Sequence, residues 1–143
     1  MSDDPRSNSA LSDDQLVALA LRARENAYAP YSKYNVGAAL ITADGTVFTG
    51  ANVENASYGL CICAERTAIA QAISQGHREL GRVAVVTQSS PPAAPCGLCR
   101  QTINEFTSEP TKLRILLENL QGERREFTLG ELLPHGFRGK DIE

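Results

Sequence analysis

Four cysteines, Cys61, Cys63, Cys96 and Cys99, are the residues of this 143-residue chain whose type and spacing most directly suggest chemistry. Cys96 and Cys99 are three positions apart, so on the first turn of a helix their thiols lie on one face and can chelate a single metal ion. The same C-x-x-C spacing also occurs in thioredoxin-like redox pairs and by coincidence. This motif alone therefore leaves zinc binding and dithiol chemistry open.

Cys63 supplies a possible third ligand, because it also stands at the start of a predicted helix. The helix, strand and loop between Cys63 and Cys96 have about the length of an α/β unit, which can bring two helix N-termini together. The positive end of each helix dipole favours thiolate over thiol there. Three protein ligands on tetrahedral zinc leave the fourth position open for water, which is the arrangement of catalytic zinc sites.

Glu65 follows Cys63 by two residues and falls on the first turn of the same predicted helix. A carboxylate there could lie beside the metal-bound water and exchange protons with it. Regular helical geometry places residues i and i+2 on different faces, so the spacing permits this arrangement without requiring it. The alternative is an exposed first-turn glutamate that the helix dipole favours.

Cys61 remains after this assignment. A closed site of four thiolates would need Cys61 beside Cys63, but an extended C-x-C segment points its two side chains apart. A spare buried cysteine is also common. We therefore expect Cys61 not to bind the metal.

The composition indicates one folded domain. Hydrophobic residues make up 42% of the chain and charged residues 22%, and 14 basic against 17 acidic side chains give a net charge of −3. This balance lacks the positive excess that nucleic-acid binding uses, and the apolar runs are too short to cross a membrane. Residues 1–10 are polar and acidic, so we expect a flexible tail, no secretory signal and a cytoplasmic protein with reduced thiols.

The pattern then predicts the elements that position the cysteines. Ser12 and Gln15 form a capping box that starts a helix, which Pro30 ends. Two antiparallel strands should follow, joined by a turn at Asp44-Gly45. Their predicted ranges are 35–42 and 46–53.

Two further helices, 63–74 and 96–106, each begin at a cysteine. Strands are predicted at 82–87, 113–118 and 125–128, and a helical turn at 130–133. This order predicts an α/β fold, a three-layer α/β/α sandwich with one mixed sheet of about five strands. It does not fix the order of the strands. We place the domain at residues 11–137 and a C-terminal tail at 138–143.

The cysteine motifs resemble a known signature. C-A-E at 63–65 followed by P-C-G-L-C at 95–99 resembles the zinc deaminase motif, in which a ligand precedes a catalytic Glu and P-C-x-x-C follows. The resemblance extends over residues 11–137 and is to the small cytidine deaminases that act on free nucleosides. Deaminases that edit nucleic acid more often have His as the first ligand. The N-V-E-N segment at 52–55 fits the nucleoside branch better than the relatives that deaminate the antibiotic blasticidin.

The resemblance implies a cytidine deaminase-like fold and one Zn²⁺ per chain on Cys63, Cys96 and Cys99. A zinc-bound hydroxide would attack C4 of the pyrimidine while Glu65 carries protons to N3 and to the leaving ammonia. The reaction would convert cytidine, and also deoxycytidine, to uridine or deoxyuridine plus ammonia in pyrimidine salvage. Arg66 would donate hydrogen bonds to the ligand sulfurs and offset their negative charge.

The resemblance also implies a substrate-binding set and an assembly. Asn52 and Glu54 project to the same side of a predicted strand, and the family places ribose contacts there. Tyr34 stands where relatives often carry a Phe near the pyrimidine. Relatives form homotetramers in which residues such as Tyr58 and Phe137 cross subunit boundaries. The alternatives are an aminohydrolase for a cytosine-containing antibiotic, a structural zinc module and a dithiol oxidoreductase.

Overall fold

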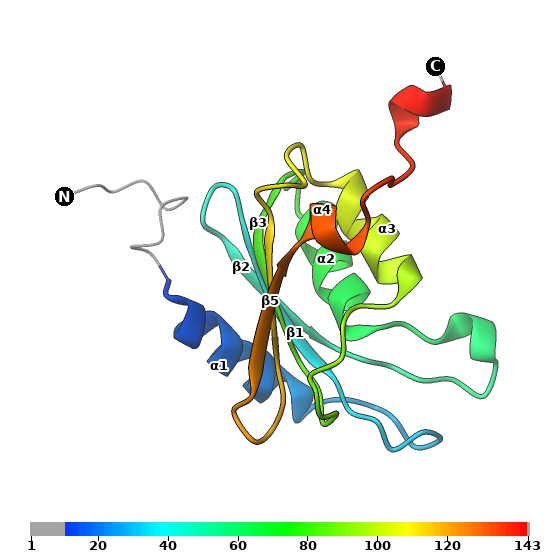
Figure 1. Cartoon of the computed structure of the whole chain (residues 1–143). Helices are drawn as coiled ribbons and strands as arrows, with labels where there is room; N and C mark the ends of the chain where they lie inside the picture. The colour runs from blue at the N-terminus through cyan, green and yellow to red at the C-terminus, as the bar shows by residue number, and fades with distance from the viewer. Residues whose placement is uncertain (1–10, 143) are drawn as a thin grey trace.

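The computed structural model describes residues 11–142, whose five strands form one mixed sheet in the order β2-β1-β3-β4-β5 (Figure 1). β3 and β4 run parallel, and the other neighbouring pairs are antiparallel. The elements in chain order are α1 (Asp13–Arg24), β1 (Gly37–Thr42), β2 (Val47–Ala51), the 3₁₀ turn η2 (Tyr58–Leu60), α2 (Ala64–Ser74), β3 (Leu80–Val86), α3 (Gly97–Glu105), β4 (Arg114–Glu118), β5 (Arg124–Thr128), α4 (Leu129–Leu132) and the 3₁₀ turn η3 (Gly139–Ile142).

Helices cover both faces of this sheet. α1 lies on one face, where Leu16 and Ala20 pack against Ala84 and Leu116 of the central strands. α2, α3 and α4 lie on the other face, as Figure 1 shows, and their apolar side chains surround residues such as Leu117 in the larger core. The predicted three-layer α/β/α sandwich with five strands is therefore confirmed.

The central strands are apolar because both of their faces are covered. All six residues of β1 are buried, and β3 is buried except at Gly81. A strand between two helical layers needs a continuous apolar run instead of alternation. β5 lies at the edge, and its first three residues are exposed and charged, which discourages pairing with another chain.

The predicted start of the first helix is confirmed, but its end comes earlier than expected. Ser12 and Gln15 form the capping box, and α1 ends at Arg24, several residues before Pro30. The backbone N–H of Tyr28 instead donates to Asn52 O at 2.9 Å. This pairing gives the chain after α1 a partner outside the helix, so helix propensity does not decide its conformation.

Two glycines allow tight local geometry. Gly45 has a φ of 91° at the predicted turn between β1 and β2. A Cβ on Gly50 in β2 would lie 2.7 Å from Ala64 O at the start of α2. The absence of a side chain at Gly50 therefore lets the first turn of α2, which carries Glu65, rest directly on the sheet.

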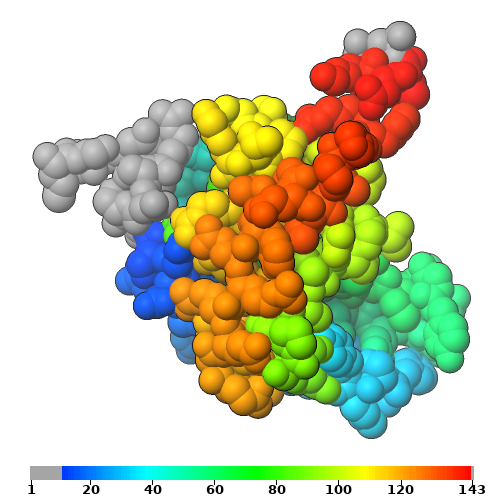
Figure 2. Space-filling model, in the orientation of Figure 1, coloured from blue at the N-terminus to red at the C-terminus, as the bar shows by residue number. Residues whose placement is uncertain are grey.

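The expected N-terminal tail, residues 1–10, lies outside the described residues. In the expected C-terminal tail the chain forms η3, which stands out from the rest of the molecule in Figure 2. The segment around η2 also extends outward (Figure 1). Within residues 11–142, every helix is too short or too polar to span a lipid bilayer.

Candidate functional site

Two helix N-termini meet at the cysteines. Cys63 is the N-cap of α2 and Cys96 is the N-cap of α3, and neither side chain forms a capping hydrogen bond. Cys99 lies one turn into α3 and is buried. The three sulfur atoms lie within 4.8 Å of one another, so the structure brings together the three residues that the sequence singles out as ligands.

The spacing of the sulfurs suits zinc. Tetrahedral zinc with Zn–S bonds of about 2.3 Å separates its sulfur ligands by about 3.8 Å. The Sγ atoms of Cys63 and Cys96 are 3.7 Å apart. Three thiolates form a donor set that suits zinc, and a tetrahedral ion with three protein ligands keeps its fourth position for water or substrate.

The electrostatics also favour a thiolate at this site. A hydrogen bond from the Cys99 thiol, with help from Arg66, lowers the pKa of Cys63 to about 5. The same hydrogen bond raises the pKa of Cys99, because that thiol keeps its proton while Cys63 is charged. Both N-caps also lie at the positive ends of helix dipoles. The cluster is therefore ready to exchange its remaining protons for a cation.

Arg66 lies against this cluster. Its Nη2 is 3.8 Å from Cys63 Sγ and donates to Cys61 O at 3.3 Å. Its Nε is buried and has no hydrogen-bond partner among residues 11–142. The guanidinium thus places a positive charge next to the cysteine cluster, where it offsets part of the negative charge of the Cys63 thiolate.

Cys61 faces away from the cluster. Its Sγ accepts from Asn55 N at 3.4 Å and donates to Asn55 O at 3.6 Å. The two cysteines of the C-x-C segment therefore point in different directions, as an extended chain requires. Cys61 is not one of the three residues whose ligand atoms come together.

A cavity of about 340 Å³ opens in front of the cysteines. This volume falls in the range of about 300–1,000 Å³ that small-molecule sites occupy. The cavity lies at the carboxyl end of β3, the edge where α/β sheets commonly bind ligands. Its polar lining residues include Ser32, Tyr34, Asn52, Glu54, Glu65 and Thr87, together with Cys63 and Cys96.

Glu65 is a buried carboxyl group in this lining. Its side chain is almost inaccessible, with 5% relative exposure, and it lies on the first turn of α2. Burial raises the pKa of Glu65 to about 7, and the neighbouring Cys63 thiolate adds to the increase. The alternative of an exposed, dipole-favoured glutamate does not describe this side chain.

Asn52 and Glu54 both line the cavity, although β2 ends at Ala51 and they lie just beyond it. The Asn52 amide donates to Tyr34 O at 2.8 Å and accepts from Val36 N at 2.9 Å. Its side chain therefore supports the backbone of the neighbouring loop. One N–H and one lone pair of this amide remain for a ligand.

Glu54 supports the same loop from its other end. Its Oε1 accepts from the backbone N–H groups of Tyr31 at 3.0 Å and Ser32 at 3.1 Å, and its Oε2 accepts from the Ser32 hydroxyl. These hydrogen bonds, that of the Ser32 hydroxyl first, lower the pKa of Glu54. A carboxylate has about four acceptor positions, so Glu54 also retains the capacity to accept from a ligand hydroxyl.

Tyr34 is half-buried in the cavity lining, and its hydroxyl forms a hydrogen bond with Ser89 Oγ. Neither Ser89 nor Ser32 is among the site residues that the sequence predicts. Ser32 follows Tyr31 in a short polar turn, and only its proximity to Glu54 in space reveals its role. Ser89 lies in a proline-rich loop without periodicity, so the sequence carries no signal for it.

Tyr58 and Phe137 do not line the cavity. Tyr58 in η2 is 83% exposed, and Phe137 is 56% exposed. The backbone carbonyl of Phe137 accepts from Gln101 Nε2 at 2.8 Å and Asn104 Nδ2 at 3.1 Å. Two side chains of α3 therefore fix the backbone of Phe137 while its ring faces outward.

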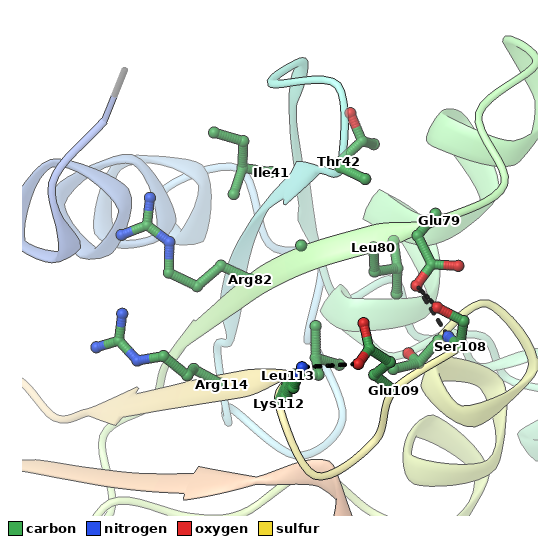
Figure 3. Close-up of a pocket in the computed structure, with 13 residues that line it drawn as sticks. Ile41, Thr42, Glu79, Leu80, Arg82, Ser108, Glu109, Lys112, Leu113 and Arg114 are labelled. Atoms are coloured by element: carbon green, nitrogen blue, oxygen red, sulfur yellow. Dashed lines mark hydrogen bonds and ion pairs between the residues drawn. The ribbon is translucent and has the colours of Figure 1, made fainter. Parts of the chain in front are cut away.

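A second cavity lies at the opposite end of the central strands (Figure 3). Its charged side chains have partners within the chain: Glu79 accepts from Ser108 N and Oγ at 2.8 Å, and Lys112 pairs with Glu109 at 2.9 Å. Figure 3 shows both pairs as dashed lines. The charged side chains of this second cavity are therefore paired within the chain.

Three convergent cysteines and a buried carboxyl group beside an open cavity, on a three-layer α/β/α sandwich, form the arrangement expected of a zinc-dependent hydrolase. Comparison with known sequences gives the family. Residues 11–113 match the profile of the cytidine and deoxycytidylate deaminase zinc-binding region. The chain belongs to the cytidine deaminase family.

Individual relatives agree with this assignment. The chain is 50% identical over 127 residues to a cytidine deaminase of Halalkalibacterium halodurans, which covers 89% of this chain and 95% of that protein. It is 45% identical over 129 residues to a cytidine deaminase of Sporosarcina psychrophila, covering 90% and 93%. A crystal structure of cytidine deaminase from Burkholderia pseudomallei superposes with a TM-score of 0.84 at 51% identity, covering 89% of this chain and all of that one.

Proposed function

We propose that this protein catalyses the hydrolytic deamination of cytidine, and of deoxycytidine, to uridine or deoxyuridine and ammonia. The observation that carries this proposal is the position of Glu65. It is a buried carboxyl group that shares one cavity with the cysteine cluster. A charged or chargeable group is expensive to bury, so its place in the lining of a ligand-sized cavity favours a role in proton transfer.

Cys63, Cys96 and Cys99 would hold one zinc ion per chain. Bound zinc would supply Lewis acidity and an activated water near neutral pH. Three thiolates reduce the positive charge of the ion, and Arg66 together with the two helix N-termini counteracts this reduction. The chain would therefore hold the cation and still allow it to lower the pKa of a bound water.

Glu65 would move the protons of the reaction. It takes one proton from the attacking water as the oxygen bonds to C4 of the pyrimidine, and it delivers this proton to N3. It then transfers the second water proton to the amino group as the C4–N bond breaks and ammonia leaves. Water and cytidine are consumed, and uridine and ammonia are produced, so the atoms balance.

Asn52 and Glu54 would bind the ribose hydroxyls, while the ring of Tyr34 would contact the pyrimidine. Both polar side chains retain unused hydrogen-bonding capacity toward the cavity. Their existing hydrogen bonds to the backbone of residues 31–36 hold them in place. A side chain that is fixed before the ligand binds loses less entropy on binding.

The cavity favours a nucleoside over a nucleotide. None of the described residues that line it is Lys or Arg, and Glu54 and Glu65 are both acidic. A phosphate group would enter without a positive partner and near two carboxyl groups, which is electrostatically unfavourable. The family profile covers both cytidine and deoxycytidylate deaminases, and the charges of this cavity support the first of these activities.

We also propose a homotetramer in which Tyr58 and Phe137 contact neighbouring subunits. Tyr58, Leu60 and Ile62 are exposed on the segment that extends from the molecule in Figure 1. Exposed apolar side chains in one segment are typical of subunit interfaces. Sedimentation at assay concentration tests this proposal, and an active monomer would contradict it.

The cellular setting that we propose is pyrimidine salvage in the cytoplasm. All four cysteines are free thiols in the structure, and a reducing compartment keeps thiols available for a metal.

The decisive experiment follows the loss of cytidine absorbance as uridine forms, with and without a zinc chelator. We expect turnover that the chelator removes and added zinc restores. Deoxycytidylate and blasticidin are assayed in parallel, and turnover of either in preference to cytidine would shift the assignment to another branch. Bound zinc without any turnover would favour a structural zinc module, and thiol-disulfide exchange by the zinc-free chain would favour a dithiol oxidoreductase.

A further inference from the structure

Two loops line the cavity from opposite parts of the chain. The loop 31–36 lies between α1 and β1 and contributes Tyr34. The loop 87–95 joins β3 to α3, contributes Ala93, and ends next to Cys96. Neither loop has regular secondary structure, so the width of the cavity depends on what holds the two loops together.

One side-chain hydrogen bond links the two loops directly. It runs between the hydroxyl of Tyr34 and Oγ of Ser89, and both residues are half-buried. Among the side-chain hydrogen bonds of residues 11–142, no other joins these loops without an intermediary. Arg24 forms an indirect link, because it donates to Asn35 O at 2.8 Å and to Gln88 Oε1 at 3.0 Å.

An asparagine side chain holds the backbone carbonyl of each member of the Tyr34–Ser89 pair. The carbonyl of Tyr34 accepts from Asn52 Nδ2 at 2.8 Å. The carbonyl of Ser89 accepts from Asn119 Nδ2 at 3.1 Å, and Asn119 is only 2% exposed. The contact therefore connects two anchored points, one fixed to the end of β2 and the other to the end of β4.

We propose that Tyr34 and Ser89 form a positioning pair that sets the separation of the two loops and thereby the fit of the cavity around the nucleoside. This inference rests on the proposed assignment of the cavity as the substrate site. The hydroxyl of Tyr34 acts through Ser89, whereas its ring lines the cavity. The pair influences how the cavity encloses the whole substrate. Its loss should therefore weaken binding of the ground state and of the transition state by the same factor.

The test replaces only the two hydroxyl groups, in Tyr34→Phe, Ser89→Ala and the double variant. A hydrogen bond of this kind contributes about 2- to 10-fold in an equilibrium constant. We therefore expect KM for cytidine to rise about 2- to 10-fold in each single variant, with kcat nearly unchanged and one zinc per chain retained. The double variant should show the same KM as the single variants, because both remove one interaction.

Ser90→Ala is the matched control. Ser90 is the next residue in the same loop, but its hydroxyl donates to Glu123 Oε1 at 2.8 Å and not to the loop 31–36. Its KM should equal that of the unchanged protein. Amide hydrogen exchange in the loop 87–95 should increase in Tyr34→Phe, because the loop loses its direct connection to the opposite wall.

Ala93→Leu separates this inference from the assignment of the cavity, because it adds a larger side chain to the cavity lining and keeps both hydroxyl groups of the pair. If Ala93→Leu raises KM and the hydroxyl variants do not, the positioning pair is wrong and the substrate site stands. If Ala93→Leu also leaves KM unchanged, the cavity is not the substrate site and the inference falls with it. Additive KM effects, or a loss confined to kcat, would also overturn the pair.

Discussion

The sulfur atoms of Cys63 and Cys96 lie 3.7 Å apart, although 33 residues separate them in the chain. Each cysteine is the residue that begins a helix, so the contact joins two helix N-termini. The α2-β3 unit between them crosses from one side of the site to the other. One α/β crossover therefore creates a metal site that neither helix forms alone.

Zinc binding should depend on three of the four cysteines. Cys63→Ala, Cys96→Ala and Cys99→Ala should each lose most of the bound zinc, because two thiolates hold the ion much more weakly than three. Cys61→Ala is the matched control and should keep one zinc per chain, since its thiol faces Asn55. Metal analysis after dialysis measures this. Zinc loss in Cys61→Ala together with retention in Cys63→Ala would contradict the assignment.

Glu54→Ala should lower kcat/KM for cytidine without removing zinc. A hydrogen bond to a charged group contributes about 1.5–3 kcal/mol, which corresponds to about 10- to 150-fold in kcat/KM. Steady-state kinetics and metal analysis on the same sample check both parts. Glu105→Ala removes an exposed carboxylate that does not line the cavity and serves as the control.

The structure changes one expectation for Glu54. Its carboxylate also fixes the backbone at Tyr31 and Ser32, so part of the loss in Glu54→Ala comes from the loop. Ser32→Ala removes one donor to the carboxylate and leaves the charge in place, and it should cost less activity than Glu54→Ala. Unchanged kinetics in Glu54→Ala would show that this carboxylate does not bind the ribose hydroxyls.

The sequence was sufficient to predict the elements that have strong local signals. The capping box at Ser12 and the turn at Asp44-Gly45 are both present, since each depends on side chains and φ angles within a few residues. The order of helices and strands was also enough to predict the three-layer sandwich. The strand order was not predictable, because it depends on which long-range pairs bury the most apolar surface.

The candidate site also contains residues that the sequence predicts and contacts that it does not. The C-x-x-C and C-A-E spacings identify the cysteines and Glu65, because a metal site requires fixed residue types at fixed positions. The sequence did not predict that Asn52 and Glu54 support a distant loop, or that Ser89 meets Tyr34. These contacts join segments far apart in the chain, and a polar residue in a loop has no periodicity to mark its partner.

The ion pairs of Asp13 should make the free energy of unfolding depend on pH. Asp13, in the first turn of α1, pairs with Arg82 of β3 and Arg114 of β4, and the Arg82 side chain is 5% exposed. Asp13→Asn should lower the free energy of unfolding by about 1–3 kcal/mol at pH 7, because it leaves a buried guanidinium without a charged partner. Asp14→Asn, at an 86% exposed side chain, is the control and should cost less than about 0.5 kcal/mol.

The sign of the pH effect follows from the hydrogen bonds of Asp13. The Arg114 guanidinium, followed by Arg82, lowers the pKa of Asp13 below its ordinary value of 3.8. A lowered carboxyl pKa stabilises the fold above the unfolded-state value, and the contribution is lost as the pH falls through the folded-state value. Urea titrations should therefore show a constant difference in the free energy of unfolding between the unchanged protein and Asp13→Asn above about pH 5. Below that pH the difference should shrink. A difference that does not change with pH would contradict this account.

Glu65→Gln should separate catalysis from folding. Glutamine keeps the shape of the side chain but cannot exchange protons, so turnover of cytidine should fall by about 10²- to 10⁴-fold. Because a buried carboxyl is costly to desolvate, the neutral amide should leave the free energy of unfolding unchanged or higher. The variant should still bind one zinc per chain. Glu131→Gln changes a first-turn glutamate of α4 outside the cavity and should keep full activity. Turnover above about a tenth of the unchanged protein in Glu65→Gln would show that this residue is not the proton carrier.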